Sequence, residues 1–150
     1  VDMPPGTGDV PLTVFQSLPI DGIIVVASPQ ELVSMIVEKA VKMANMMNVP
    51  ILGLVENMAW FTPAELPENK YYIFGKEGCK KLAKEMNLPL LAQIPIVQGL
   101  CESGDDGKPA ALNSDSILGQ VFLNLAQAVV TVVNRRNKEM GPTKIVEVKN

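Results

Sequence analysis

The 150-residue chain contains no histidine. It therefore has no histidine of its own for general acid–base catalysis, for a Ser-His-Asp triad or for binding a metal ion. Cysteine is also scarce, and two residues, Cys79 and Cys101, cannot build a disulfide framework. Because no signal-peptide pattern opens the chain, these two thiols favour a reducing, cytoplasmic location.

Basic residues do not dominate the charge. Thirteen Lys and Arg stand against 16 Asp and Glu, which gives a net charge of −3 and a pI near 5.0. A nucleic-acid-binding domain needs a basic patch or stripe, and no uninterrupted apolar run reaches the length that crosses a bilayer. The composition therefore predicts neither a nucleic-acid nor a membrane partner. Apolar residues at 47% and charged residues at 19% are typical of a folded globular domain.

The Gly-rich loop ending in Gly-Lys-Ser/Thr, which grips nucleotide phosphates, is missing as well. The two Gly-Lys pairs, at 75–76 and 107–108, are followed by Glu and Pro. The chain nevertheless opens with Asp-Met-Pro-Pro-Gly-Thr-Gly-Asp at residues 2–9. An acidic residue leaving a strand, followed by a glycine loop whose N–H groups can face a phosphate, indicates the Walker-B half of a nucleotide site. Asp2 would hold a Mg²⁺-bound water, and the alternative interpretation is an ordinary strand-ending turn.

Short apolar runs alternate with longer segments of helical periodicity, which predicts an α/β fold with a mostly parallel sheet covered by helices. Strands are expected at 22–27, 51–55 and 88–94, the first of them buried on both faces, and helices at 28–47, 77–87 and 115–137. Residues 1–137 form one unit in this prediction. The tail, 138–150, is either an edge strand at 144–148 or loose.

The first of these helices has a distinct predicted start. Ser28 is expected to cap it, with Pro29 in the first turn and Glu31 closing a capping box. Residues 56–74 are irregular and too long for a simple connector. Ligands of open α/β sheets bind beyond the carboxyl ends of the strands. The loops of interest are therefore 2–9, 28–30, 56–62 and 95–109.

Several segments together resemble the Mrp/ApbC group of P-loop ATPases, the iron–sulfur cluster carriers related to MinD and the nitrogenase iron protein. They are residues 2–9, Glu56-Asn57-Met58, Ile73-Phe74-Gly75, Gln93-Ile94-Pro95 and Gly104–Pro109. The resemblance extends to about Asn134. It implies a doubly wound domain of the P-loop NTPase type that dimerises around nucleotide. Because the first residue is Val and the Walker-A loop of this family lies well upstream, we expect the chain to be the C-terminal part of such a domain.

The resemblance also implies roles for single residues. Asp2 matches the Walker-B aspartate that acts on Mg²⁺ through water, and Gly6 matches the switch glycine that senses the γ-phosphate. Asn57 matches the asparagine that reads the adenine edge, with a structural turn as its alternative role. Pro95 falls in the adenine-side loop, whereas Asp9 belongs to the motif without an assigned role.

One feature departs from the family. Many members carry a Cys-Pro-x-Cys pair one residue after Glu-Asn-Met-x-x-Phe and bind a bridging cluster with it. Here Pro63 and Leu66 occupy the two cysteine positions, and neither side chain can ligate iron. A [4Fe-4S] cluster, possible in the family, thus loses its usual ligands in this chain.

The resulting expectation is part of an ATP-binding, Mg²⁺-dependent ATPase that carries or assembles iron–sulfur clusters. Its partners would be ATP, a second copy of itself and apo iron–sulfur proteins. Without the phosphate loop and its lysine, the chain alone should hydrolyse ATP poorly. The alternatives are a non-catalytic scaffold that retains the ATPase fold, and a fragment without separate function.

The remaining predictions concern packing. Helical register places Cys79 in the core, whereas Cys101 lies in a predicted loop near the expected site and its role stays open. The aromatic residues Trp60, Phe61, Tyr71 and Tyr72 either pack on the sheet, which we favour, or form a dimer-facing surface. One edge of the sheet is expected to be apolar and unpaired, and to be covered by dimerisation, strand exchange or the tail.

Overall fold

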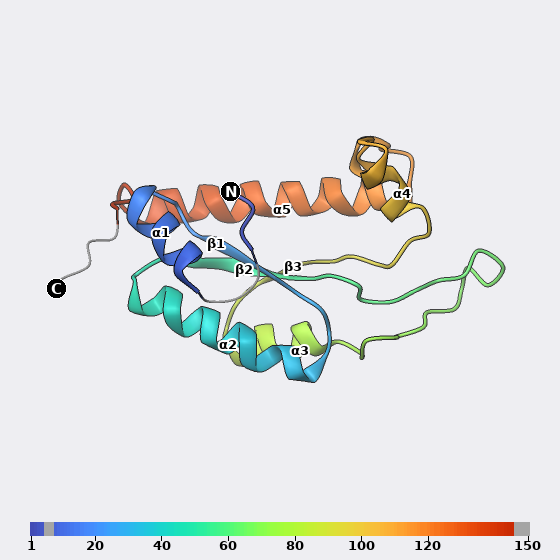
Figure 1. Ribbon diagram of the computed structural model, residues 1–150, viewed down its shortest axis with the longest axis horizontal. Coiled ribbons are helices and arrows are strands. Elements are labelled where there is room, and N and C mark those ends of the chain that lie inside the picture. The colour runs from blue at the N-terminus through green and yellow to red at the C-terminus, as the bar shows by residue number, and fades with distance from the viewer. Residues whose placement is uncertain (5–7, 146–150) are drawn as a thin grey trace.

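A parallel β-sheet lies between two layers of helices (Figure 1). The computed structural model describes residues 1–4 and 8–145. The described elements are α1 (Asp9–Ser17), β1 (Ile23–Ala27), α2 (Glu31–Met46), β2 (Ile51–Glu56), α3 (Gly78–Glu85), β3 (Leu90–Gln93), α4 (Leu100–Asp105), the 3-10 helix η1 (Ala110–Leu112) and α5 (Ile117–Glu139). This confirms the α/β class and the three strands predicted from the apolar runs.

The sheet has the order β1-β2-β3, and both pairings are parallel. In the central strand β2, neighbouring residues face opposite sides of the sheet. Leu54, fully buried, packs with α2 and α3 residues, and Val55, 2% exposed, packs with residues of β3 and α5. The uninterrupted apolar run at 51–55 thus encodes a strand with helices on both faces.

Each face of the sheet has its own core. On the side of α2 and α3, the buried residues are Ala27, Val37, Leu54, Cys79, Leu82 and Ala83. On the side of α5, they are Val55, Ile94 and Leu118. Figure 1 shows α5 along one face of the sheet, with α2 and α3 on the opposite face.

The run at 22–27 gives a strand, but burial on both faces is wrong for it. Val26 of β1 is 62% exposed, and within the described ranges β1 pairs with β2 alone. Both β1 and β3 are outer strands of the described sheet, and β1, with its exposed Val26, matches the expected unpaired apolar edge. The tail does not cover it as far as residue 145, and residues 146–148 of the expected tail strand lie outside the described residues.

The predicted start of the helix at 28–47, which is α2 in the structure, is wrong. It begins at Glu31, its N-cap is Gln30, and no side chain makes a capping bond. As an N-cap, Ser28 would accept the first hydrogen bond of the helix with its carbonyl oxygen. This oxygen instead lies 3.4 Å from the Cys79 thiol sulfur, which donates to it. Contact with α3 therefore holds residues 28–30 outside the helix.

Two helices occur where no helix was predicted. α1 buries Pro11 and Phe15 at a spacing of one helical turn, with Asp9 in its first turn. α4 occupies part of the predicted loop 95–109, so Cys101 lies in a helix; its side chain is not among the described parts. Short helices with few buried residues leave a weak periodic signal in the sequence.

The last helix, α5, is anchored at both ends. The Ser116 hydroxyl accepts a hydrogen bond from the backbone N–H of Gly119 at 2.9 Å, which caps its start. At its end, the Arg136 guanidinium, buried to nine-tenths, lies 3.3 Å from the Asp21 carboxylate. The Thr143 hydroxyl donates to the same carboxylate at 2.6 Å. These contacts hold the chain after α5 beside the segment that leads into β1.

By length and composition alone, α5 could also cross a membrane. Our prediction from uninterrupted apolar runs overlooked this, because single polar residues divide a long segment without charge. In the structure one side of α5 packs on β2 and β3, through Leu118 and the neighbouring Val121, Phe122 and Leu125. Of its most apolar 18-residue window, 17% is buried within the described chain.

Residues 57–75 form an extended arm between β2 and α3. The backbone of Phe61 exchanges two hydrogen bonds with Tyr71, each 2.8 Å long, and Phe61 also bridges to Ile96. The arm runs beyond the ends of α2 and α3 before it returns (Figure 1). Tyr71 and Tyr72 are 46% and 38% exposed, so the expectation that these aromatic residues pack on the sheet is wrong for both.

Candidate functional site

Two predicted nucleotide-binding residues lie at one edge of the sheet, where β2 and β3 end. Asn57 directly follows β2, and Pro95 lies two residues beyond the end of β3. The backbone N–H of Ile94 donates to the Glu56 carbonyl at 2.8 Å, and that of Ala59 donates to the Ile94 carbonyl at 2.9 Å. The loops after both strands are thus held to each other. The structure therefore brings Asn57 and Pro95 to a common edge, as expected for parallel strands.

Asn57 also has a local structural contact. Its backbone N–H donates to the Ala27 carbonyl at 2.8 Å, which ties the loop to the end of β1. Its side-chain Oδ1 accepts a hydrogen bond of 2.9 Å from the N–H of Met58, whose φ of 56° is left-handed. The bond from Met58 occupies the Oδ1 atom of Asn57, and the Nδ2 group of the same amide can donate to a ligand. Base reading by Asn57 stays a prediction.

The acidic half of the predicted site lies on irregular backbone. Asp2 is exposed, and residues 1–4 lie outside any strand. Gly6 lies in 5–7, outside the described residues. Asp9 is the first residue of α1, where a carboxylate stabilises the positive end of the helix dipole.

Pro63 and Leu66, at the expected cysteine positions, are the two ends of a turn in the arm. The backbone N–H of Leu66 donates to the Pro63 carbonyl at 3.2 Å. Pro63 is half-buried, and Leu66 is 48% exposed. The turn is the geometry that a Cys-x-x-Cys pair uses to present two thiolates together, but here it presents two side chains without a metal ligand.

Cys79 is a buried core residue, as predicted, with 2% exposure. Burial, with a smaller contribution from the Glu56 charge, raises the pKa of the Cys79 thiol to about 11. Its Sγ donates to the carbonyls of Ala27 and Ser28, at 3.6 and 3.4 Å. A buried thiol with a raised pKa is a poor nucleophile at neutral pH, which fits a structural role for Cys79.

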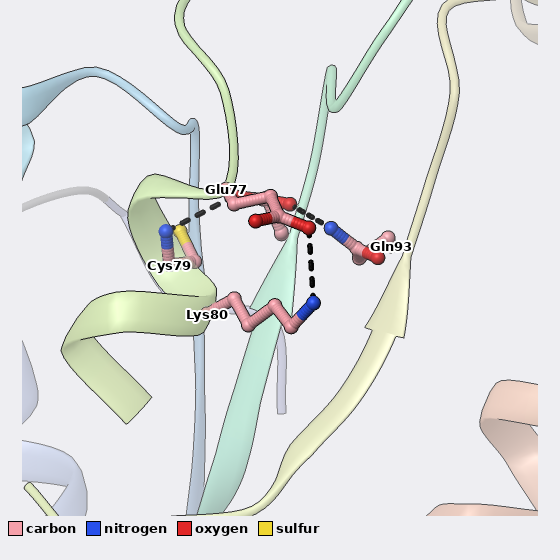
Figure 2. Close-up of polar contacts among 5 residues, drawn as sticks. Glu77, Cys79, Lys80 and Gln93 are labelled. Atoms are coloured by element: carbon pink, nitrogen blue, oxygen red, sulfur yellow. Dashed lines mark hydrogen bonds and ion pairs between the residues drawn. The ribbon is translucent and has the colours of Figure 1, made fainter. Parts of the chain in front are cut away.

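The residue that sequence reasoning missed is Glu56. It is 1% exposed, and its carboxylate accepts hydrogen bonds from the backbone N–H of Cys79, at 3.0 Å, and from the side-chain amide of Gln93. Figure 2 shows Cys79 at the start of α3 and Gln93 on β3, on the two sides of the end of β2. An acidic residue that closes an apolar strand was the available signal.

A separate cavity of about 310 Å³ lies between the starts of α2 and α3. Residues 27–31 and 75–79 form much of its wall, and Asn57 and Pro95 are not among its lining residues. The lining contains Lys76 and Lys81 together with Glu31 and Glu85, so the formal charges of the lining balance. We therefore place the candidate site at the β2–β3 edge rather than in this cavity.

The electrostatics near the edge include one exposed ion pair. The Lys80 ammonium lies 2.9 Å from the Glu77 carboxylate, which lowers the pKa of Glu77 and raises the pKa of Lys80. Within the described ranges, no group of three or more His, Cys, Asp and Glu residues is arranged to enclose a metal ion.

Comparison with known proteins places these features in context. The sequence model of the ParA family, described as a NUBPL iron-transfer P-loop NTPase, matches residues 1–130. An iron–sulfur cluster carrier protein of Synechocystis is 45% identical over 113 residues, which cover 75% of this chain and 32% of that protein. The iron–sulfur cluster transfer protein NUBPL of Mus musculus is 40% identical over 131 residues, which cover 87% of this chain and 41% of that protein.

A solved structure gives the same result for the fold. The nucleotide-binding protein of Archaeoglobus fulgidus, in complex with ADP, is 40% identical and superposes with a TM-score of 0.63. The match covers 71% of this chain and 43% of that one. The chain therefore spans less than half the length of these relatives.

Proposed function

The chain belongs to the ParA family of NUBPL-type iron-transfer P-loop NTPases, and on this premise we propose that it forms the Mg²⁺- and base-binding part of an ATP-dependent iron–sulfur cluster carrier. The observation that carries the proposal is the common edge of β2 and β3, where Asn57 and Pro95 lie. The relatives named as cluster carriers and the relative in complex with ADP support it.

In this proposal each predicted site residue has a separate task. Asn57 donates its amide N–H to the adenine ring, and Pro95 packs beside the base. Asp2 would hold Mg²⁺ through a water, and the backbone N–H of Gly6 would sense the γ-phosphate. Water attack on the γ-phosphate needs positioning and charge stabilisation more than covalent chemistry from the protein. The chain by itself lacks the phosphate loop and its lysine, and we expect it to hydrolyse ATP poorly.

The donor set at Asp2 fits Mg²⁺. This ion keeps several waters and is held by one or two carboxylates together with substrate phosphates, rather than by a cage of protein ligands. A single exposed carboxylate, without a cluster of three acidic residues in the described ranges, matches that requirement. The ion would supply neutralisation of phosphate charge when bound.

Nucleotide titration tests the proposal directly. The natural gene product that carries this chain is titrated with Mg-ATP and ADP by calorimetry, and compared with Asn57→Ala. Loss of one base-reading hydrogen bond should weaken binding roughly tenfold. Asn69→Ala, at an exposed position of the arm, is the matched control and should bind as the unmodified protein does. A gene product that binds neither nucleotide contradicts the proposal.

A second candidate function is a scaffold that binds partner proteins without carrying a cluster. Pro63 and Leu66, in place of the cysteines, favour it, as does the exposure of Leu66 and Tyr71 on the arm. Iron and sulfide analysis after anaerobic reconstitution separates the two. Stoichiometric iron supports a carrier with ligands other than residues 63 and 66, whereas nucleotide binding without iron supports an ATP-dependent scaffold.

We also propose that the protein works as a homodimer in a reducing, cytoplasmic compartment and delivers its cargo to apo iron–sulfur proteins. The buried, protonated Cys79 agrees with a reducing setting. Cell fractionation tests the compartment, and sedimentation with and without Mg-ATP tests the dimer. A protein that stays monomeric with Mg-ATP contradicts the dimer.

A further inference from the structure

Glu56 is the buried acidic residue of the described chain, and its carboxylate connects three elements. It ends β2, accepts a hydrogen bond of 3.0 Å from the Cys79 N–H at the start of α3, and accepts a second from the Gln93 amide on β3. Figure 2 shows Cys79 and Gln93 reaching the end of β2 from opposite sides. One side chain thus fixes the distances among β2, β3 and α3 at the edge that carries the candidate site.

The backbone around this carboxylate extends the same connection. The Glu56 carbonyl accepts from the Ile94 N–H at 2.8 Å. Asn57, the next residue, donates its N–H to the Ala27 carbonyl, which also accepts from the Cys79 thiol. Through its backbone and its side chain, Glu56 is thus connected both to Asn57, the next residue, and to the segment Gln93–Ile94 that leads to Pro95.

A carboxylate is a costly choice for a purely structural position. Burial of a charge opposes folding, and a well-packed apolar residue of similar size is often as stable or more stable. No salt bridge to Glu56 occurs in the described part of the chain, so the two hydrogen bonds offset most of the cost of burying its carboxylate. Lys80 adds a weaker electrostatic interaction with Glu56. Directional bonds to two different elements fix geometry in a way that apolar contacts do not.

We propose that Glu56 is a positioning residue of the nucleotide site, which holds Asn57 and the Pro95 loop in the arrangement that binds the base. This inference rests on the proposed nucleotide-binding function and goes beyond it, because Glu56 itself does not touch the ligand. It predicts that nucleotide affinity depends on the Glu56–Gln93 and Glu56–Cys79 hydrogen bonds even where the fold is intact.

Three variants of the gene product test the proposal. Glu56→Ala removes both hydrogen bonds and should raise the Kd for ADP about tenfold or more. Glu56→Gln can keep both, since its oxygen accepts from Cys79 and a turned Gln93 amide accepts from its N–H. Its Kd should stay within about threefold of that of the unmodified protein.

The matched control for stability is Leu54→Ala, in the same strand and fully buried. It should lower the unfolding midpoint but leave the Kd within about threefold, because Leu54 contacts the α2–α3 core rather than the edge. All Kd values are measured at a temperature where circular dichroism shows each variant folded. If Glu56→Ala does not fold, Gln93→Met replaces it, since it removes one of the two donors, and it should raise the Kd several-fold.

The outcomes separate the inference from the function on which it rests. A folded Glu56→Ala that binds ADP as tightly as the unmodified protein overturns the positioning role alone. If Leu54→Ala and Glu56→Ala raise the Kd for ADP equally, the positioning role is also overturned, because the effect would then be general destabilisation. Failure of the unmodified protein to bind any nucleotide overturns both. Weak binding by Glu56→Ala, with rescue by Glu56→Gln, supports the inference.

Discussion

At the scale of single residues, Glu56 and Cys79 are neighbours with complementary hydrogen-bonding roles. The Glu56 carboxylate receives hydrogen bonds from two N–H donors, and the Cys79 thiol gives its proton to backbone carbonyls. Each side chain is satisfied by fixed groups of the fold rather than by solvent. The negative carboxylate close to the sulfur opposes formation of a thiolate.

Cys79 should therefore react slowly with alkylating reagents. A pKa of about 11, compared with the ordinary 9.0, lowers the thiolate fraction at pH 8 roughly a hundredfold. The alkylation rate of Cys79, followed by peptide mass spectrometry, should fall at least that far below its rate in the urea-unfolded chain.

The same pKa shift predicts how stability depends on pH. Because the folded pKa lies above the unfolded one, the contribution of Cys79 is complete below pH 9 and is lost as pH rises toward 11. Urea midpoints of the unmodified protein and Cys79→Ala should thus converge between pH 9 and 11. Parallel midpoints across this range would contradict the shift.

The predicted Walker-B role of Asp2 requires an accessible carboxylate, and Asp2 is exposed. Asp2→Asn in the natural gene product should reduce Mg²⁺-dependent ATP hydrolysis by roughly a hundredfold or more, because the neutral amide no longer stabilises the water on Mg²⁺. The thermal midpoint should not change, since Asp2 is exposed and lies outside any helix or strand. Turnover is measured by phosphate release.

Asp9→Asn is the control for this change. It belongs to the same sequence motif, and the structure gives it a place in the first turn of α1. It should cost less than about 1 kcal/mol of stability and leave turnover unchanged. If Asp2→Asn and Asp9→Asn reduce turnover equally, the Walker-B assignment of Asp2 is wrong.

At the scale of elements, α3 is packed tightly against the loop that follows β1. A Cβ atom on Gly78, the first residue of α3, would lie 2.1 Å from the Pro29 carbonyl oxygen. Such a contact cannot form, so any side chain at this position must push the helix and the loop apart. Glycine is therefore required at residue 78, where α3 approaches the loop after β1 closely enough to bury Cys79 as well.

Gly78→Ala should destabilise the fold by about 1–3 kcal/mol, because backbone atoms on both sides of the contact must move. Gly104→Ala is the matched control, since a Cβ on this residue of α4 meets nothing within 4 Å. It should be neutral or up to about 1 kcal/mol stabilising. Urea unfolding measures both changes, and equal midpoints for the two variants would contradict the tight contact.

The sequence predicted those elements whose signal lies within the element itself. The apolar run at 51–55 and the long periodicity at 115–137 predicted β2 and α5 to within two residues. The start of α2 depends instead on the contact between Ser28 and Cys79, 51 residues apart in the chain. No local pattern contains such a contact, which explains the wrong capping box.

In the candidate site, too, the sequence predicted the locally encoded residues but not the long-range contacts. Asn57 and Pro95 could be named because they belong to short motifs that follow strands. The bonds of Glu56 to Cys79 and Gln93 join residues 23 and 37 positions apart, and depend on how α3 and β3 meet β2. Only the register of the assembled sheet reveals them.

At the scale of the whole molecule, the outer edge of β1 dominates the surface properties. In the described part of the chain β1 is paired on one side only, and its residue Val26 is 62% exposed. An unpaired apolar edge is a template for a further strand. We expect the chain to associate with itself through this edge as concentration rises.

Val26→Lys should weaken that association roughly tenfold, because a charge on an edge strand opposes pairing with a second strand. Sedimentation velocity over a range of concentrations measures the change. Leu112→Lys is the control, since Leu112 is 81% exposed but lies on η1, away from β1. Equal weakening by both variants would indicate general apolar association instead of edge pairing.

The strand order β1-β2-β3 repeats the order of the strands along the chain. A ribosome therefore releases each strand after the neighbour on which it pairs, and the sheet can grow during synthesis without rearrangement. In pulsed hydrogen exchange during refolding, amides between β1 and β2 should become protected before those of β3. The β2–β3 edge is complete only once β3 has emerged. The nucleotide binding proposed for this edge would therefore follow the pairing of β1 with β2 in the nascent chain.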